Sequence, residues 1–248
     1  MTLTRPVGKY GLLPGHVPDS LHDLTWYAAG VLSRAPSEVE PPAPGKAGDW
    51  GMDGNDTVGD CGVAGFHHGD MAVSDDTATP QLPVTADELV QYYLTYTGGQ
   101  DNGVVLADFL AYVQQNNFFG RKVAGYAPVS IADFATLQFT VNAYGYAYCG
   151  IQVTDRMEQA FSDSTPWTAS MFTHGNVQGG HCVPLVGYDD TSLYCVTWGR
   201  VQAILYSAWH LISMEAWAVI MGEVPASGLD KHGVSLVSLS SDLARLSR

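Results

Sequence analysis

The chain has 248 residues, of which 46% are hydrophobic and 15% charged. This composition excludes a disordered or fibrous protein, and the length is sufficient for a buried core that needs no disulfide staples. Eleven Lys and Arg residues against 25 Asp and Glu residues give a formal net charge of −14. Because nucleic acids and anionic lipid surfaces repel such a chain, we expect neither nucleic-acid nor membrane binding.

The sequence lacks the apolar runs that secretion or membrane insertion requires. Glycines and a proline interrupt residues 8–15, which predicts a non-secreted protein that is cytoplasmic or virion-associated. Polar residues such as Gln202 and Glu215 interrupt the most apolar stretch, residues 201–221. We therefore expect that stretch to be a core segment rather than a transmembrane helix.

Four cysteines lie at positions 61, 149, 182 and 195, without a CxxC pair. The spacing predicts neither a zinc knuckle nor a disulfide framework, so we expect reduced thiols, no metal and no cofactor. Cys182 and Cys195 are expected on adjacent strands, where they could pair or pack. Packing is the prediction for a non-secreted chain.

The first predicted elements are an extended arm and a buried helix. Residues 1–48 are rich in Pro and Gly and predict an arm laid over a domain, in which only residues 21–32 are apolar enough to pack. The absence of Pro and the apolar pattern predict a helix over residues 61–73. Its glycines lower helix propensity, yet Cys61, Gly65 and Gly69 fall four apart, which predicts a smooth strip where another backbone approaches closely.

Further helices and then strands follow. Thr85 and Glu88 have the spacing of a capping box and predict a helix through Tyr96. We expect further helices over residues 104–116 and 131–142, a buried strand over 146–153, a hairpin of residues 181–188 and 193–199, and a last strand over 216–221. The domain is expected to span residues 49–222. The tail, 223–248, predicts a short docking helix on this or a neighbouring subunit.

Cys61 follows Asp60, which can cap the predicted helix. The free N–H groups and the helix dipole would then favour a thiolate. A lone cysteine is more often a small buried core residue. If the hairpin turn centres on Asp190, His181 lies opposite Thr197, Trp198 or Gly199. A histidine there could be a structural residue or a shielded general base.

Two sequence strings, NDTVGDCGVAGF and GGHCVPLVGYDDTSLYCVTWG, together resemble the papain-like cysteine peptidase superfamily over residues 49–221. The segment DNGVVLADFLAYVQQNN is similar to that family's glycine loop and following helix. The resemblance implies a two-lobed α+β fold, with a helical first lobe built on a Cys-bearing helix and an antiparallel β second lobe.

The resemblance also implies a site. Cys61 would be the nucleophile, His181 the base and Trp198 a shield against water. Asn55 takes the position of the family's oxyanion-hole glutamine, six residues before the cysteine, and is one methylene shorter. Such a site would cleave a peptide or isopeptide bond in a peptide or protein substrate.

Two departures keep a second hypothesis open. Val196 stands where the family has the asparagine that orients the histidine, and Thr197 is a possible substitute. The arm has about half the length of the family's inhibitory prosegment, which implies no ordinary zymogen. The DCGVA motif and the missing asparagine are similar to bacteriocin-processing peptidase domains. The alternative is a catalytically impaired papain-like fold that serves as a binding or assembly module, for example in a phage particle, and forms homo-oligomers through its arm and tail.

The other polar residues give weaker indications of a functional site. His67 and His68 are expected on the polar face of the Cys61 helix rather than as metal ligands. The acidic pairs at 75–76 and 189–190 are expected to be solvated turns rather than cation sites.

Overall fold

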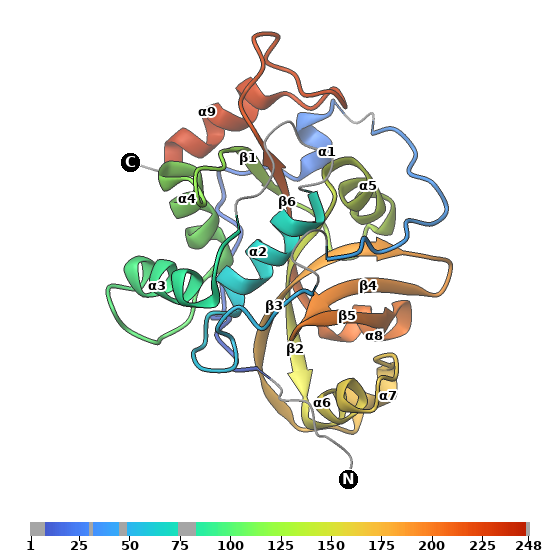
Figure 1. Cartoon of the computed structure of the whole chain (residues 1–248). Helices are drawn as coiled ribbons and strands as arrows, with labels where there is room; N and C mark the ends of the chain where they lie inside the picture. Colours follow the sequence, from blue (N-terminus) through green and yellow to red (C-terminus); the bar gives the residue numbers. More distant parts are fainter. Residues whose placement is uncertain (1–7, 30–31, 45–48, 74–82, 247–248) are drawn as a thin grey trace.

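Helices cover both faces of one antiparallel sheet in the computed structural model, which describes residues 8–29, 32–44, 49–73 and 83–246 (Figure 1). The helices are α1 (Leu24–Tyr27), α2 (Cys61–Val73), α3 (Ala86–Tyr96), α4 (Leu106–Asn116), α5 (Phe134–Tyr144), α6 (Asp155–Ser162), α7 (Ala169–Thr173), α8 (Tyr206–Ile212) and α9 (Leu236–Leu246). No helix in these described ranges is both long and apolar enough to cross a bilayer.

The strands are β1 (Val123–Pro128), β2 (Ala147–Thr154), β3 (Val177–Tyr188), β4 (Ser192–Thr197), β5 (Arg200–Leu205) and β6 (Ser213–Met221). They form one sheet in the order β1-β6-β2-β3-β4-β5, in which every neighbouring pair is antiparallel. β3 is the longest strand, and its hairpin with β4 is the one that the sequence predicts.

Helix α2 packs against β3 at the centre of the molecule (Figure 1). Every residue from Cys61 to Met71 is buried, so the prediction of a central, buried helix is confirmed. A Cβ added to Gly65 would lie 3.2 Å from the Cys182 carbonyl oxygen, and one added to Gly69 would lie 2.4 Å from the Tyr146 ring. The glycines therefore offset their low helix propensity by allowing close contact with the sheet.

The C-terminal tail docks on this same chain. Leu239 of α9 contacts Gly125 of β1 so closely that a Cβ there would lie 2.7 Å from the Leu239 side chain. The Tyr27 hydroxyl at the end of α1 donates a hydrogen bond to Asp242 of α9 (3.0 Å). This hydrogen bond links the arm to the tail, and the tail itself packs on β1.

Several predicted bounds are wrong for identifiable reasons. The helix expected from residue 104 begins at Leu106, because the Val104 carbonyl accepts from Leu13 N–H of the arm instead of from a helix N–H. The helix expected at 131–142 is shifted to α5, because the Asp133 side chain caps its start and Gly145, at φ +83°, ends it. Residues 201–221 divide into β5, α8 and β6, and β1 was not predicted. Residues 216–220 are buried as expected, whereas Ser207, His210 and Leu211 of α8 are exposed.

Candidate active site

One small cavity brings the predicted site residues together. Cys61 is the first residue of α2, and His181 lies in β3, the strand on which α2 packs. The residues that share the cavity wall with this pair include Asn55, Val196, Thr197 and Trp198. Two segments 120 residues apart therefore meet at one point of the fold.

Thr197, the last residue of β4, occupies the place of an orienting group. Its Oγ1 lies 2.7 Å from Nε2 of His181, and both side chains are buried. Val196 lines the cavity and cannot form such a bond. Within the described part of the chain, Nδ1 of His181 has no hydrogen-bond partner. The hydroxyl thus fixes one ring nitrogen and leaves the other available for proton transfer.

Trp198 covers the imidazole. The two rings stack with centroids 4.8 Å apart and an interplanar angle of 28°. Trp198 and Gly199 form the tight turn between β4 and β5, and both have positive φ, +45° and +79°. This turn geometry matches the twist of the hairpin and holds the indole over His181.

The N-terminal arm crosses this site like an added strand. Lys9 N–H donates to the Asn55 carbonyl (2.6 Å), and the Asn55 side-chain amide donates to the Lys9 carbonyl (2.9 Å). Leu12 N–H donates to the Gly180 carbonyl, at 3.2 Å. Val104 N–H donates to the Gly11 carbonyl (2.7 Å), and Leu13 N–H to the Val104 carbonyl (2.8 Å). The arm is therefore held as an extended backbone by main-chain hydrogen bonds to Asn55, Val104 and Gly180, and these three residues define what we call the groove.

The arm fits closely because glycines line the contact. A Cβ on Gly11 would lie 1.6 Å from the Gly59 carbonyl oxygen, and one on Gly8 would lie 2.3 Å from Oδ1 of Asn55. Tyr10 packs edge-on against both His181 and Trp198. The short arm thus covers the site, which the expectation from its length alone did not anticipate.

Burial under the arm keeps the pair uncharged. Burial raises the pKa of the Cys61 thiol to about 12, and the backbone N–H groups of Cys182 and Gly11 offset only part of that rise. Burial lowers the pKa of His181 to about 3. The expectation that the helix N-terminus favours a thiolate is therefore wrong for this covered state, because desolvation outweighs the helix dipole.

Asp60 occupies the N-cap position, and its carbonyl accepts from Ala64 N–H (3.0 Å), but no described helix N–H donates to its carboxylate, so the side-chain cap expected from the sequence is not formed. Burial raises the pKa of its carboxyl to about 7, and the nearby amide of Asn55 offsets only part of that rise. The carboxyl thus titrates near neutrality beside the candidate oxyanion-hole amide.

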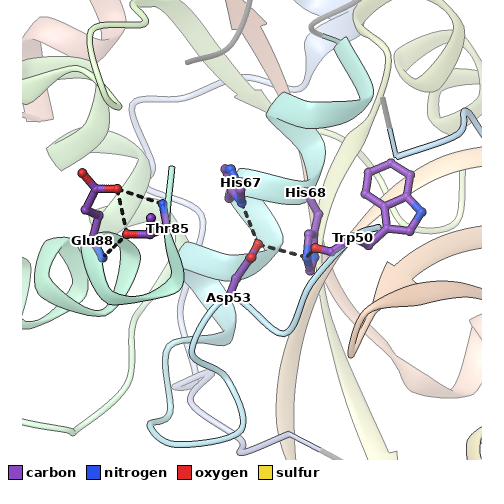
Figure 2. A network of polar contacts seen from close by, with 6 residues as sticks. All are labelled: Trp50, Asp53, His67, His68, Thr85 and Glu88. Atoms are coloured by element: carbon purple, nitrogen blue, oxygen red, sulfur yellow. Dashed lines mark hydrogen bonds and ion pairs between the residues drawn. The ribbon is translucent and has the colours of Figure 1, made fainter. Parts of the chain in front are cut away.

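The expectation that His67 and His68 lie on a polar face is wrong. Both are buried and contact the carboxylate of Asp53, which precedes α2 (Figure 2). A buried acid 14 residues before His67 gives no periodic signal in the sequence. The contact made by Tyr10 could not be predicted either, because nothing in the sequence of the Pro- and Gly-rich arm indicates which ring this tyrosine contacts.

The remaining polar candidates are structural. Cys149, Cys182 and Cys195 are buried free thiols. The prediction that Cys182 and Cys195 pack rather than form a disulfide is confirmed. The Asp189 carboxylate accepts from the Thr191 and Ser192 N–H groups within the β3–β4 turn. The acidic pair at 75–76 lies outside the described residues.

The helical lobe with a Cys-bearing central helix, followed by an antiparallel sheet that carries the histidine, defines a papain-like α+β fold. Among solved structures, the chain is similar to xylellain, a cysteine protease from Xylella fastidiosa, with a TM-score of 0.60 and 15% sequence identity. The match covers 87% of this chain and 97% of xylellain. No protein-family model matches the chain, and a search of curated proteins finds no match.

Proposed function

We propose that the chain is a papain-like cysteine peptidase or amidase that cleaves peptide or isopeptide bonds. One observation carries the proposal: an extended segment of the chain lies over the site, with Tyr10 against the His181 ring and the Lys9 carbonyl bound to the Asn55 amide. The groove thus offers a thiol, an imidazole and an amide donor to an extended backbone. A substrate chain would replace the arm and use the same main-chain partners, Val104 and Gly180.

The reaction begins when the arm leaves and water reaches the pair. The Cys61 thiol gives its proton to Nδ1 of His181, and the thiolate attacks the carbonyl carbon. The tetrahedral oxyanion accepts hydrogen bonds from the Asn55 side-chain amide and the Cys61 backbone N–H, each worth about 3 kcal/mol in related acyl transfers. The carbon–nitrogen bond then breaks as His181 protonates the leaving amine. Water, deprotonated by His181, hydrolyses the thioester and regenerates the thiol.

Thr197 supports this mechanism as the group that orients His181. We expect Thr197→Val, which removes the hydroxyl and keeps the side-chain shape, to lower kcat by about 10²-fold because the imidazole loses its fixed orientation. Thr197→Ser keeps the hydroxyl and should retain most of the activity. Steady-state kinetics with one peptide substrate compare the three proteins, and equal kcat values for all three would contradict an orienting role.

The proposal is tested by incubating an unfolded, cysteine-free polypeptide with the full chain and with a Gly11→Val variant, whose arm cannot pack. Mass spectrometry of the products then identifies new N- and C-termini. We expect cleavage by both proteins, faster with the variant. No cleavage by either protein would overturn the peptidase proposal and leave the binding or assembly module as the better account.

A further inference from the structure

A buried charge cluster lies below the candidate active site. Asp53 Oδ2 contacts His67 Nδ1 at 2.6 Å and His68 Nε2 at 3.0 Å, and the same His68 nitrogen lies 2.7 Å from the Trp50 carbonyl oxygen (Figure 2). The two histidines and the aspartate are each less than a tenth exposed. The mechanism proposed above uses none of these groups.

Only one histidine of this cluster reaches the site. His68 follows Cys61 by seven residues, or about two helical turns, so both lie on the same face of α2. Its side chain lines the same cavity as Cys61 and His181. His67 is absent from that cavity wall and lies beside Phe118 instead, with ring centroids 6.3 Å apart.

The contacts place a proton on Nε2 of His68 and a carboxylate beside it. A carbonyl only accepts hydrogen bonds, so Nε2 of His68 carries a proton toward Trp50. Although burial opposes a charge on the ring, the Asp53 carboxylate raises the pKa of His68. Burial likewise opposes ionisation of Asp53, but the two histidines hold the pKa of that carboxyl well below its usual range. The buried Asp53 carboxylate, 3.0 Å from Nε2, therefore favours the imidazolium form of His68.

We propose that protonated His68 is a positioning residue that sets the ionisation of the Cys61–His181 pair through its charge. This inference rests on the proposed function. A fixed positive charge in the cavity wall favours the thiolate of Cys61 and opposes a second positive charge on His181. Both effects shift the pH range in which the Cys61–His181 pair is reactive toward lower pH.

Several titratable groups surround His68, and their charges also affect its protonation. They come from the loop before α2, from α2 itself and from β3, and they are Asp53, Asp60, His67, Cys61, His181 and Cys182. The cavity residues of β4, Val196 and Thr197, carry no charge. Of these neighbours, Asp53 is the one that contacts the His68 ring directly.

The test is the pH dependence of Cys61 alkylation in the full-length Gly11→Val chain, whose displaced arm uncovers the thiol, followed by mass spectrometry of the Cys61 peptide; each histidine substitution is added to this variant. His68→Gln keeps an N–H for the Trp50 carbonyl and removes the charge. The thiolate then loses a favourable neighbour, so we expect the midpoint of the rate profile to move to higher pH by about one pH unit. His67→Gln is the matched control, since it removes the other contact to Asp53 and should leave the midpoint within a few tenths of a pH unit.

An unchanged midpoint in His68→Gln, or an equal shift in both variants, would overturn the proposal. If His68→Gln does not fold, NMR of the wild-type chain with ¹⁵N-labelled histidine decides the question. We expect His68 to carry protons on both nitrogens at pH 7 while His181 is neutral, and a neutral His68 would overturn the proposal. Alkylation does not require hydrolysis, so this result is separable from failure of the peptidase proposal.

Discussion

Cys61→Ala is expected to abolish peptide hydrolysis, to below the detection limit of the assay. The Cys61 thiol is the proposed nucleophile in the cavity that the imidazole of His181 shares, and removing it removes the atom that forms the acyl intermediate. Cys182 also lines this cavity, but burial raises the pKa of its thiol well above its usual range. Cys195→Ala is the matched control: Cys195 is an equally buried free thiol, but it lies in β4 outside the cavity wall. We expect the control to keep the wild-type rate per folded molecule.

Thermal unfolding of both variants accompanies the assay, because each substitution removes a buried sulfur and leaves a small void. Comparable losses of stability with loss of activity in Cys61→Ala alone would support the assignment. Cleavage by Cys61→Ala at the wild-type rate would show that another group performs the chemistry.

Gly11→Val is expected to increase alkylation of Cys61 by about 10²- to 10³-fold at neutral pH. A Cβ at this position would lie 1.6 Å from the Gly59 carbonyl oxygen, so the arm cannot keep its place. Burial raises the pKa of the thiol from 9.0 to about 12, and uncovering reverses that rise, which increases the thiolate fraction by up to about three orders of magnitude. Peptide hydrolysis should rise as well, because the groove becomes free for substrate.

Leu13→Val is the matched control for the arm. It introduces the same residue two positions further on, where the native side chain is 41% exposed and the backbone bond to Val104 does not depend on it. We expect this variant to react at the wild-type rate. If Gly11→Val and Leu13→Val both alkylate as slowly as the wild type, the arm does not control access to Cys61.

Local patterns in the sequence were sufficient for the elements that carry the site. The helix over 61–73 was predicted with its bounds, because its apolar residues and its glycine strip both reflect contact with the sheet. The capping box of Thr85 and Glu88 is present at the start of α3. The proximity of Cys61 and His181 followed from the resemblance of two motifs, in their order along the chain, to a known family.

Other features depend on contacts that no local pattern records. Strand β5 and helix α8 are divided within a continuous apolar stretch, which periodicity alone does not resolve. The arm binds the groove mainly through backbone groups, and its main-chain hydrogen bonds specify no side chain. The ion pair of His68 depends on Asp53, a residue with a left-handed backbone, at φ +56°, whose carboxylate lies 3.0 Å from the His68 ring.

The central claim is that Cys61 attacks a carbonyl in the groove that the arm covers. The most direct measurement is to mix Gly11→Val with a peptidyl ester at mildly acidic pH, quench rapidly and weigh the protein by mass spectrometry. We predict a mass gain equal to one acyl group, located on the peptide that contains Cys61 and absent from Gly11→Val combined with Cys61→Ala. Ester turnover without such an adduct, or an acyl group on another residue, would contradict the account.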